Sequence, residues 1–289
     1  MVTTLLRAMR PSQWTKNFFL FAGLVFSQHV FHGPFFFKTV LAFFAFCLLT
    51  SGVYIMNDVI DVKEDRLHPT KRTRPIASGR LTIARALSTA CLLVVVSMVL
   101  SFILDFDFGM TALIYLLLMV FYSLLFKRVE ILDVLVISSG FILRVVAGTL
   151  LIGVTISSWL LTCTIFLSLF LALGKRRHEL GLVQSGMEGH RSVLQKYNLP
   201  FLDQLIAVAA ASTLLSYALY SMSESTVEKF GSENLKFTIP FVVYGLFRYM
   251  YLIYIRKGGG NPGKDLFSDR ALLIDVILWV IAVGFILYV

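Results

Sequence analysis

Residues 35–65, FFFKTVLAFFAFCLLTSGVYIMNDVIDVKED, decide how this chain is built. The first 22 of these residues carry a single charge and are long enough to cross the roughly 30 Å hydrocarbon core of a bilayer as one helix. The run then changes abruptly to the polar residues Asn57, Asp58, Asp61 and Asp65. Acids at the C-terminal end of a helix oppose its dipole, so this placement predicts a cationic partner for them.

The rest of the chain has the composition of a membrane protein. Of the 289 residues, 57% are hydrophobic and only 15% are charged, whereas about 25% are charged in soluble domains. We therefore predict an all-α, polytopic membrane protein with nine transmembrane helices. The predicted spans are residues 14–31, 36–56, 81–103, 108–126, 131–153, 157–174, 200–222, 237–255 and 270–289. The prolines fall in loops or at span ends, so we expect no span to be broken.

The basic residues alternate between the two sides of the membrane. Twenty of the 26 Lys and Arg residues lie in every second connection, and three lie in the other connections. Because basic residues favour cytoplasmic loops, this pattern predicts a multi-pass protein of the inner (cytoplasmic) membrane, with a cytoplasmic N-terminus and active site and an outer C-terminus. The same rule accounts for the net charge of +9, so we expect no nucleic-acid partner. We predict a single domain, residues 1–289, with cytoplasmic motif loops at 57–80 and 175–199.

The acidic residues fit a magnesium site. If the second span continues as a helix, Asn57, Asp58, Asp61 and Asp65 fall within an arc of about 100°. Mg²⁺ prefers oxygen ligands, binds through one or two carboxylates and shares its shell with substrate phosphates. We therefore predict that these four residues bind Mg²⁺ and, through it, a diphosphate. The alternative is a solvated helix end whose acids pair with neighbouring lysines.

A basic segment follows the acids directly. Lys71, Arg72 and Arg74 lie in HPTKRTRPIASG, residues 68–79, in which two prolines and a glycine shape a loop. The guanidinium fork matches two phosphate oxygens, so this segment is predicted to bind phosphate. The alternative for each basic residue is a loop that faces anionic lipid.

The N-D-x-x-D-x-x-x-D run at the end of the second of nine spans resembles the UbiA superfamily of intramembrane prenyltransferases. The resemblance implies a UbiA-like fold, with the nine helices around a cytoplasm-facing polar cavity. Four segments resemble one branch, the decaprenyl-phosphate phosphoribosyltransferases: MRPSQWTKNFFLFAGLVFS, HPTKRTRPIASG, KRVEILDVLVISSGFILRVVAG and LGKRRHEL. The resemblance implies Mg²⁺-dependent transfer of 5-phosphoribose from 5-phosphoribosyl 1-diphosphate to a polyprenyl phosphate, with release of diphosphate. The implied cofactor is Mg²⁺, and the implied partners are these two substrates and the bilayer. A homo-oligomer is left open.

The resemblance also implies roles for individual residues. Asp58, Asp61 and Asp65 would be catalytic, because the metal held by them and Asn57 stabilises the leaving diphosphate. Substrate contacts are expected from Lys16, Asn17, Lys71, Arg72, Arg74, Tyr122, Lys127, Arg128, Asp133, Arg144, Lys175, Arg176 and Arg177. Lys16 and Asn17 would reach the ribose 5-phosphate, whereas the neighbouring Arg10 fits an interface anchor equally well.

Arg144 stands out because it lies within a predicted span. A charge at that depth normally faces a cavity or a partner. Arg144 follows Asp133 by 11 residues, about three helical turns, so both are expected on one helix face as the wall of the polar cavity. The alternative is an arginine satisfied by backbone carbonyls for packing alone.

The end of the sixth span departs from ordinary prenyltransferases of the superfamily, which usually carry a second acidic motif, D-x-x-x-D, there. In this chain GKRRHEL, residues 174–180, has one acid, Glu179, among three consecutive basic residues, Lys175, Arg176 and Arg177. A basic site for a phosphomonoester suits both substrates of the phosphoribosyl reaction. The alternative function is prenyl transfer from a prenyl diphosphate to an aromatic or lipid acceptor. A transporter of a phosphorylated lipid or anion is disfavoured, because we expect no broken span.

Overall fold

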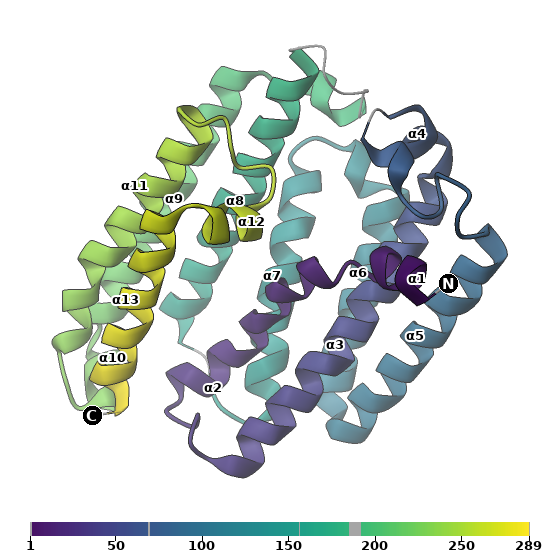
Figure 1. Cartoon of the computed structure of the whole chain (residues 1–289). Helices are drawn as coiled ribbons and strands as arrows, with labels where there is room; N and C mark the ends of the chain where they lie inside the picture. The colour runs from purple at the N-terminus through teal and green to yellow at the C-terminus, as the bar shows by residue number, and fades with distance from the viewer. Residues whose placement is uncertain (1, 69, 156, 185–191, 289) are drawn as a thin grey trace. The chain divides into compact units, whose positions relative to one another are not determined.

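The computed structural model describes residues 2–68, 70–155, 157–184 and 192–288, and these residues form helices and no strands (Figure 1). Eight of their helical segments are long and apolar enough to cross a membrane. They are α3 (Gly33–Ile60), α5 (Ile83–Leu104), α6 (Phe106–Leu124), α7 (Leu132–Leu151), α8 (Ser158–Gln184), α9 (Leu199–Met222), the segment Asn234–Tyr254 and α13 (Arg270–Tyr288). The predicted all-α, polytopic membrane fold is therefore confirmed.

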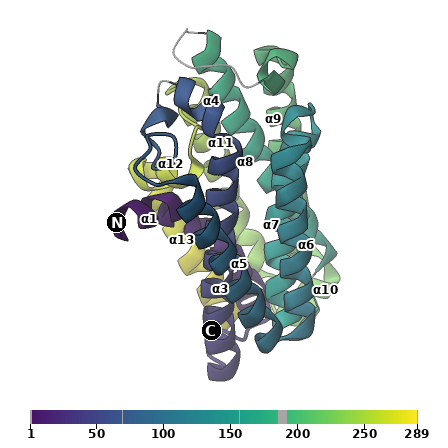
Figure 2. The same ribbon diagram turned by 90° about the vertical axis from the view of Figure 1, so that its right-hand side faces the viewer.

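The chain divides into two compact units, and each is described by itself. Unit 1 contains residues 1–155 and 183–193, and unit 2 contains residues 156–182 and 194–289. In unit 1, α3 packs against α5, and α6 packs against α7 (Figures 1 and 2). Phe46 of α3, Phe108 of α6 and Leu151 of α7 are buried together in the core of this unit. The division does not test the prediction of a single domain, which stays a prediction.

The first predicted span, residues 14–31, has an unexpected form. A 3₁₀ helix, η1 (Pro11–Phe21), continues directly into the short α2 (Ala22–Phe26), so the segment is helical but is not one α-helix. On α7, a Cβ on Gly148 would sit 2.0 Å from the carbonyl oxygen of Leu20. The backbone of η1 thus rests directly on α7. A 3₁₀ helix rises about 2.0 Å per residue, so η1 and α2 together reach roughly 30 Å, the thickness of the bilayer core.

Local signals in the sequence explain where the long helices begin. Asp105 separates α5 from α6, and its Oδ1 accepts hydrogen bonds from the backbone N–H groups of Asp107 (3.0 Å) and Phe108 (3.1 Å). Thr82 caps α5 and Asn198 caps α9 in the same way. A proline in the first turn, where its missing N–H costs nothing, begins α3, α9 and α11 (Ile239–Tyr254).

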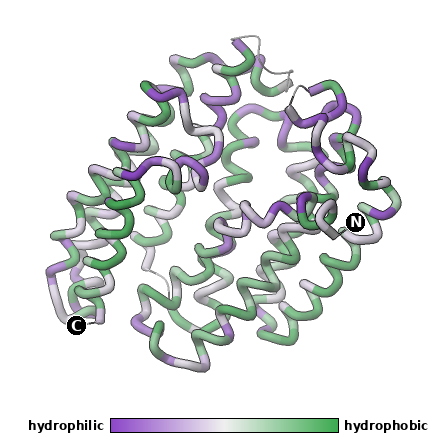
Figure 3. Tube along the Cα trace, in the orientation of Figure 1, coloured by the Kyte–Doolittle hydropathy of each residue, from purple (hydrophilic) through white to green (hydrophobic). Residues whose placement is uncertain are grey.

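Short elements in unit 1 cover the end of α3 that carries the acidic motif. They are α1 (Val2–Met9), α4 (Val62–Leu67), η2 (Lys71–Thr73) and, between α6 and α7, η3 (Phe126–Arg128). A second core fixes them: Ala8 of α1 and Ile76 of the loop are buried with Ile55 of α3 and Leu81. Hydrophilic residues gather on α4 and the turn after it, whereas α3 and α5 are largely hydrophobic (Figure 3).

Unit 2 combines long helices α8, α9, α11 and α13 with α10 (Glu224–Phe230), η5 (Asn234–Thr238) and α12 (Pro262–Ser268); η4 (Ser192–Lys196) lies at the boundary between the units. The Tyr217 hydroxyl of α9 lies 2.6 Å from the hydroxyl of Thr238 and accepts a hydrogen bond of 3.0 Å from Trp279 of α13. Helix α8 runs on to Gln184, so the first part of the predicted 175–199 loop is helical. Residues 185–191 of that predicted loop lie outside the described part of the chain.

Candidate functional site

The acidic motif lies where α3 gives way to α4. Asn57 and Asp58 are in the last turn of α3, Asp61 is the junction, and Asp65 is in α4. The backbone N–H of Asp61 donates to Asn57 O (2.9 Å), and that of Asp65 donates to Asp61 O (2.8 Å). Helical spacing is therefore kept across the junction, although the helix itself is interrupted at Asp61.

Arginines neutralise two of the three carboxylates. Nη1 of Arg74 donates to Oδ1 of Asp58 at 3.0 Å and to Oδ2 of Asp65 at 2.6 Å. Arg10 donates to the same oxygen of Asp58, and its guanidinium lies 5.3 Å from the centre of the Tyr54 ring. Asp58 and Asp65 are buried, so these contacts compensate charges that would otherwise be costly.

Arg10 is a functional candidate that the sequence analysis did not include among the substrate contacts, because an interface anchor fits it equally well. Its backbone is left-handed, with φ 54° and ψ 62°, which is uncommon for a residue other than glycine. This turn between α1 and η1 directs the side chain to Asp58. Burial lowers the pKa of Arg10, while the carboxylate of Asp58 opposes that effect. The signal in the sequence is Met9-Arg10-Pro11, because the proline begins a new helix and so indicates a turn at Arg10.

The third carboxylate, Asp61, has a partner from a distant part of the chain. Lys127 in η3 forms an ion pair with Asp61, 66 positions earlier, and is itself buried. The structure thus brings the predicted residue Lys127 to the acidic cluster, which we define as Asn57, Asp58, Asp61 and Asp65. Of its predicted companions, Tyr122 is half-buried on α6 and Arg128 is exposed.

The loop after α4 is well defined. Arg74 ends η2 and contacts the acidic cluster, while Lys71 is half-buried and Arg72 exposed. The ring Nδ1 of His68 accepts hydrogen bonds from the backbone N–H groups of Thr70 (3.2 Å) and Lys71 (3.3 Å). Within the predicted basic segment, Arg74 thus contacts the acids directly.

The donor set of the acidic cluster fits a hard divalent cation. Its members offer oxygen ligands only, which is what Mg²⁺ prefers. The buried Oδ1 of Asn57 accepts no hydrogen bond in the described part of the chain, so it is an available ligand. The carboxylates point to their basic partners, and among the described residues no three acids, histidines or cysteines form a ready-made metal cage. A cation would have to take the place of Arg10, Arg74 or Lys127.

A second polar group in unit 1 surrounds Arg144 on α7, which is buried. Nε of Arg144 donates to Oδ1 of Asn17 (2.8 Å), Nη1 to the carbonyl of Gly140 (2.6 Å) and Nη2 to the hydroxyl of Tyr115 (2.9 Å). Asn17, fully buried in η1, reaches Thr50 of α3 at 3.4 Å. Lys16 lies beside this group, within range of the charges of Arg144 and Arg10. Asp133 is also buried on α7, one helix with Arg144 as predicted.

In unit 2 the basic segment at the end of α8 is balanced by acids. Arg176 forms an ion pair with Glu179, and Nε of Arg177 donates to Oδ1 of Asp203 of α9 at 2.5 Å. Lys175 lies 3.9 Å from Glu179. The guanidinium of Arg177 also lies 4.5 Å from the centre of the Tyr254 ring. The predicted phosphate ligands Lys175, Arg176 and Arg177 therefore already have partners within their own unit.

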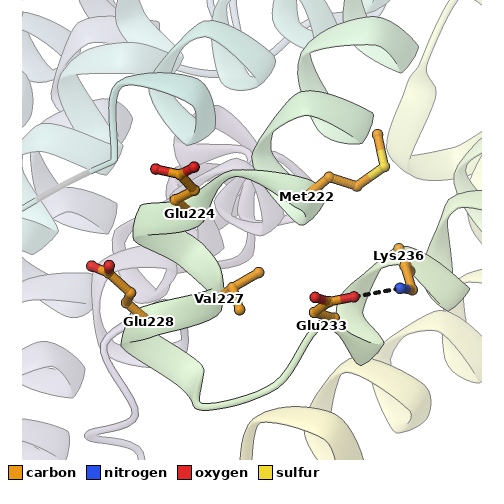
Figure 4. Close-up of a pocket in the computed structure, with 6 residues that line it drawn as sticks. All are labelled: Met222, Glu224, Val227, Glu228, Glu233 and Lys236. Carbon is orange, nitrogen blue, oxygen red and sulfur yellow. Dashed lines mark hydrogen bonds and ion pairs between the residues drawn. The ribbon is translucent and has the colours of Figure 1, made fainter.

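A pocket of about 340 Å³ in unit 2 has none of the predicted site residues in its lining (Figure 4). It is lined by Met222, Glu224, Val227, Glu228, Glu233 and Lys236. Glu233 accepts a 2.7 Å hydrogen bond from Lys236, and the other lining residues are two exposed acids, Glu224 and Glu228, and the apolar Met222 and Val227. The predicted chemistry makes no use of this pocket.

Comparison with known proteins gives the chain a family context. The model of the UbiA prenyltransferase family matches residues 17–178. A decaprenyl-phosphate phosphoribosyltransferase of Mycolicibacterium smegmatis is 30% identical, over 100% of this chain and 93% of that protein. Another protein of that name, from Corynebacterium glutamicum, is 32% identical over 99% of this chain and 87% of its own length. A UbiA homologue from Archaeoglobus fulgidus, solved with GPP and Mg²⁺, shares the fold with a TM-score of 0.72 at 17% identity, covering 99% and 100% of the two chains.

Proposed function

Because the chain belongs to the UbiA prenyltransferase family, we propose that it is a pentosyltransferase of this membrane fold. It moves 5-phosphoribose from 5-phosphoribosyl 1-diphosphate to a polyprenyl phosphate and releases diphosphate. The observation that carries the proposal is similarity over nearly the full length to proteins named for a phosphoribosyl transfer. The sixth span adds support, because basic residues stand where a prenyltransferase would have its second pair of acids.

We assign the donor diphosphate to the acidic cluster, with Mg²⁺ as the cofactor. The oxygen-only donor set and the unpartnered Oδ1 of Asn57 support this assignment. The solved UbiA homologue bound to Mg²⁺ supports it as well. Bound by Asn57, Asp58, Asp61 and Asp65, Mg²⁺ would neutralise the charge that develops on the leaving diphosphate.

Three basic residues surround the cluster, and Arg10, Arg74 and Lys127 each contact one of its carboxylates. If these carboxylates held Mg²⁺, the three side chains would be available as donors to diphosphate oxygens. Their positive charge would then stabilise the negative charge that develops on the leaving diphosphate.

The transfer needs no nucleophile from the protein. The C1–O bond of the donor breaks and its electron pair leaves with the diphosphate. An oxygen of the lipid phosphate forms the new bond to C1 and is already ionised near neutral pH. The protein contributes placement and charge, so the residues that hold the two substrates in line decide the rate.

We further propose that the acidic cluster and the N-terminus face the cytoplasm and the C-terminus lies outside. The strong bias of Lys and Arg to alternate connections supports this orientation. The length of η1 and α2 supports it too, because a ninth crossing keeps the termini on opposite sides. A soluble donor would then reach the site from the cytoplasm and a lipid acceptor from the bilayer.

A two-substrate assay on purified protein tests the function. One reaction contains 5-phosphoribosyl 1-diphosphate and a polyprenyl phosphate, and the other contains a prenyl diphosphate and 4-hydroxybenzoate, both with Mg²⁺. We expect product only in the first reaction, and loss of it with EDTA or in Asp61→Asn. Product only in the second reaction would instead support prenyl transfer.

A further inference from the structure

We propose that Trp14 and Ser51 are positioning residues of the acidic cluster. The hydrogen bond between them fixes the turn from which Arg10 reaches Asp58. The inference rests on the proposed function, in which Arg10 is available to the diphosphate once Asp58 holds the metal. Trp14 and Ser51 act on the cluster through Arg10.

The turn at Arg10 needs support on both sides. Arg10 has φ 54° and ψ 62°, a left-handed conformation that is unfavourable for a residue with a Cβ. Within the turn, the backbone N–H of Gln13 donates to the carbonyl of Arg10 at 2.8 Å. On the side of α1, Ala8 is buried in the small core with Ile55. The side of η1 must be fixed by a residue that follows Arg10.

Trp14 supplies this second support. Its Nε1–H donates to Oγ of Ser51 on α3 at 3.0 Å, and Ser51 is fully buried. The carbonyl of Met9, directly before Arg10, lies 3.2 Å from the same Oγ. The hydrogen of this hydroxyl has a nearer acceptor, the carbonyl of Cys47 at 2.6 Å, so the lone pairs of Oγ face the indole. One buried hydroxyl therefore meets the chain on both sides of Arg10.

The contacts of the turn follow one face of α3. Ser51, Tyr54 and Asp58 share this face, because about one helical turn separates each from the next. Trp14 contacts the first of them. The guanidinium of Arg10 lies 5.3 Å from the centre of the Tyr54 ring and donates to Asp58. The turn therefore runs along α3 in the opposite direction, and Arg10 stays beside Asp58 because Trp14 stays beside Ser51.

Anchoring to the membrane interface is the other role open to a tryptophan at this place in the chain. An anchoring indole keeps its N–H for water and lipid headgroups, whereas the N–H of Trp14 is bonded to a buried hydroxyl of the protein. The two roles therefore differ in the atom that they need. Trp14→Phe keeps an aromatic ring for the interface and removes only the hydrogen bond to Ser51.

Two measurements on the full-length protein in detergent test the inference. The first records the NMR signal of the Arg10 Nε–H without substrate, in protein that carries isotope-labelled arginine, and assigns it by its absence in Arg10→Gln. The ring of Tyr54 shifts this signal while the guanidinium lies over it. The second measures the dissociation constant of 5-phosphoribosyl 1-diphosphate with Mg²⁺. The variants are Trp14→Phe, Ser51→Ala and their combination, and Trp159→Phe, at an exposed position of α8, is the control.

We expect Trp14→Phe and Ser51→Ala each to move the Arg10 signal to the position of a free arginine and to raise the dissociation constant of the donor ~fivefold, as for loss of one hydrogen bond. The combined variant should do no more than either alone, and Trp159→Phe should change neither value. In an Arg10→Gln background, Trp14→Phe should cause no further loss of donor affinity, whereas a general loss of stability would lower it again.

An unchanged Arg10 signal in Trp14→Phe overturns the inference. So does an unchanged donor affinity in Trp14→Phe of a protein that binds the donor, or a further loss in the Arg10→Gln background. Failure of the proposed function reads differently, because the wild type then binds no donor. The Arg10 signal, which is recorded without substrate, still decides in that case whether Trp14 positions Arg10.

Discussion

Lys127 and Asp61 are ion-paired although 66 positions separate them in the chain. The pair joins the connection after α6 to the junction between α3 and α4, and it places a buried cation on a proposed metal ligand. If Asp61 is a metal ligand, Mg²⁺ and Lys127 would compete for its carboxylate in the absence of substrate. With the diphosphate bound, the same lysine would be a favourable neighbour.

This competition predicts that loss of Lys127 changes the affinities for metal and for donor in opposite directions. Lys127→Met should bind Mn²⁺, a spectroscopic substitute for Mg²⁺, several-fold more tightly without donor, because Asp61 loses its internal counter-ion. The same variant should bind 5-phosphoribosyl 1-diphosphate more weakly. Electron paramagnetic resonance of bound Mn²⁺ gives the first value and calorimetry the second. Lys63→Met, on the exposed side of α4, should change neither. Weaker metal binding in Lys127→Met would contradict the exchange of partners.

Arg10 should contribute to donor binding as much as the basic residues that were predicted from the sequence, such as Arg74. Arg10→Gln removes one of two guanidinium contacts to Asp58, and we expect the dissociation constant of the donor to rise by ~tenfold or more, as for loss of a charge-assisted hydrogen bond. Arg7→Gln, exposed on the preceding helix α1, is the matched control. Equal donor affinity in both variants would reduce Arg10 to an interface anchor.

Asn57 offers a test that separates ligand from scaffold. Its buried Oδ1 lacks a partner, so Asn57→Ala removes an unsatisfied acceptor and should raise the melting temperature without metal. If Asn57 is a metal ligand, the variant should also lose most of the further rise that Mg²⁺ and diphosphate give the wild type. Ser101→Ala removes a different buried group without a partner, a hydroxyl on α5, and should leave the ligand-dependent rise intact. A full rise in Asn57→Ala would exclude Asn57 as a ligand.

The close approach of η1 to α7 predicts an unusual sensitivity at one glycine. Gly148→Ala would put a Cβ 2.0 Å from the Leu20 carbonyl, and neither backbone can move away easily, so we expect a loss of stability of several kcal/mol, as for severe overpacking. Gly284→Ala meets nothing within 4 Å in α13 and should gain up to about 1 kcal/mol of helix propensity. Thermal unfolding of the two variants compares them directly. Similar melting temperatures would mean that η1 does not rest on α7.

The Arg248–Asp269 pair predicts a pH dependence of stability. Two hydrogen bonds from Arg248, of 3.0 and 2.8 Å, hold the pKa of Asp269 below its usual range. A lowered pKa stabilises the fold above the unfolded-state value of about 3.9, and this contribution disappears as the pH falls through the folded-state value. The difference in melting temperature between wild type and Asp269→Asn should therefore be constant from neutral pH to about pH 5 and should shrink below about pH 4. A difference that grows on acidification would contradict the sign.

Much of this architecture could be predicted because bilayer thickness imposes helix length. Eight apolar runs became spanning helices, and the spacing of Asn57, Asp58, Asp61 and Asp65 survived as helical geometry. The 3₁₀ form of the first span was not predicted, and neither was the contact of Leu20 with Gly148, which lies more than a hundred residues away. Ion pairs such as Lys127–Asp61 are equally non-local. Arg10 was not predicted as a site residue, because a basic residue beside an apolar segment usually anchors that segment to the membrane interface.

Tracing two labels of the donor tests the central claim most directly. Purified protein, Mg²⁺ and a polyprenyl phosphate are incubated with 5-phosphoribosyl 1-diphosphate labelled either in its 5-phosphate or in its diphosphate, and the lipid is extracted. The account predicts that the 5-phosphate label enters the lipid and the diphosphate label stays in water. A lipid that carries the diphosphate label, or no label from either donor, would contradict phosphoribosyl transfer.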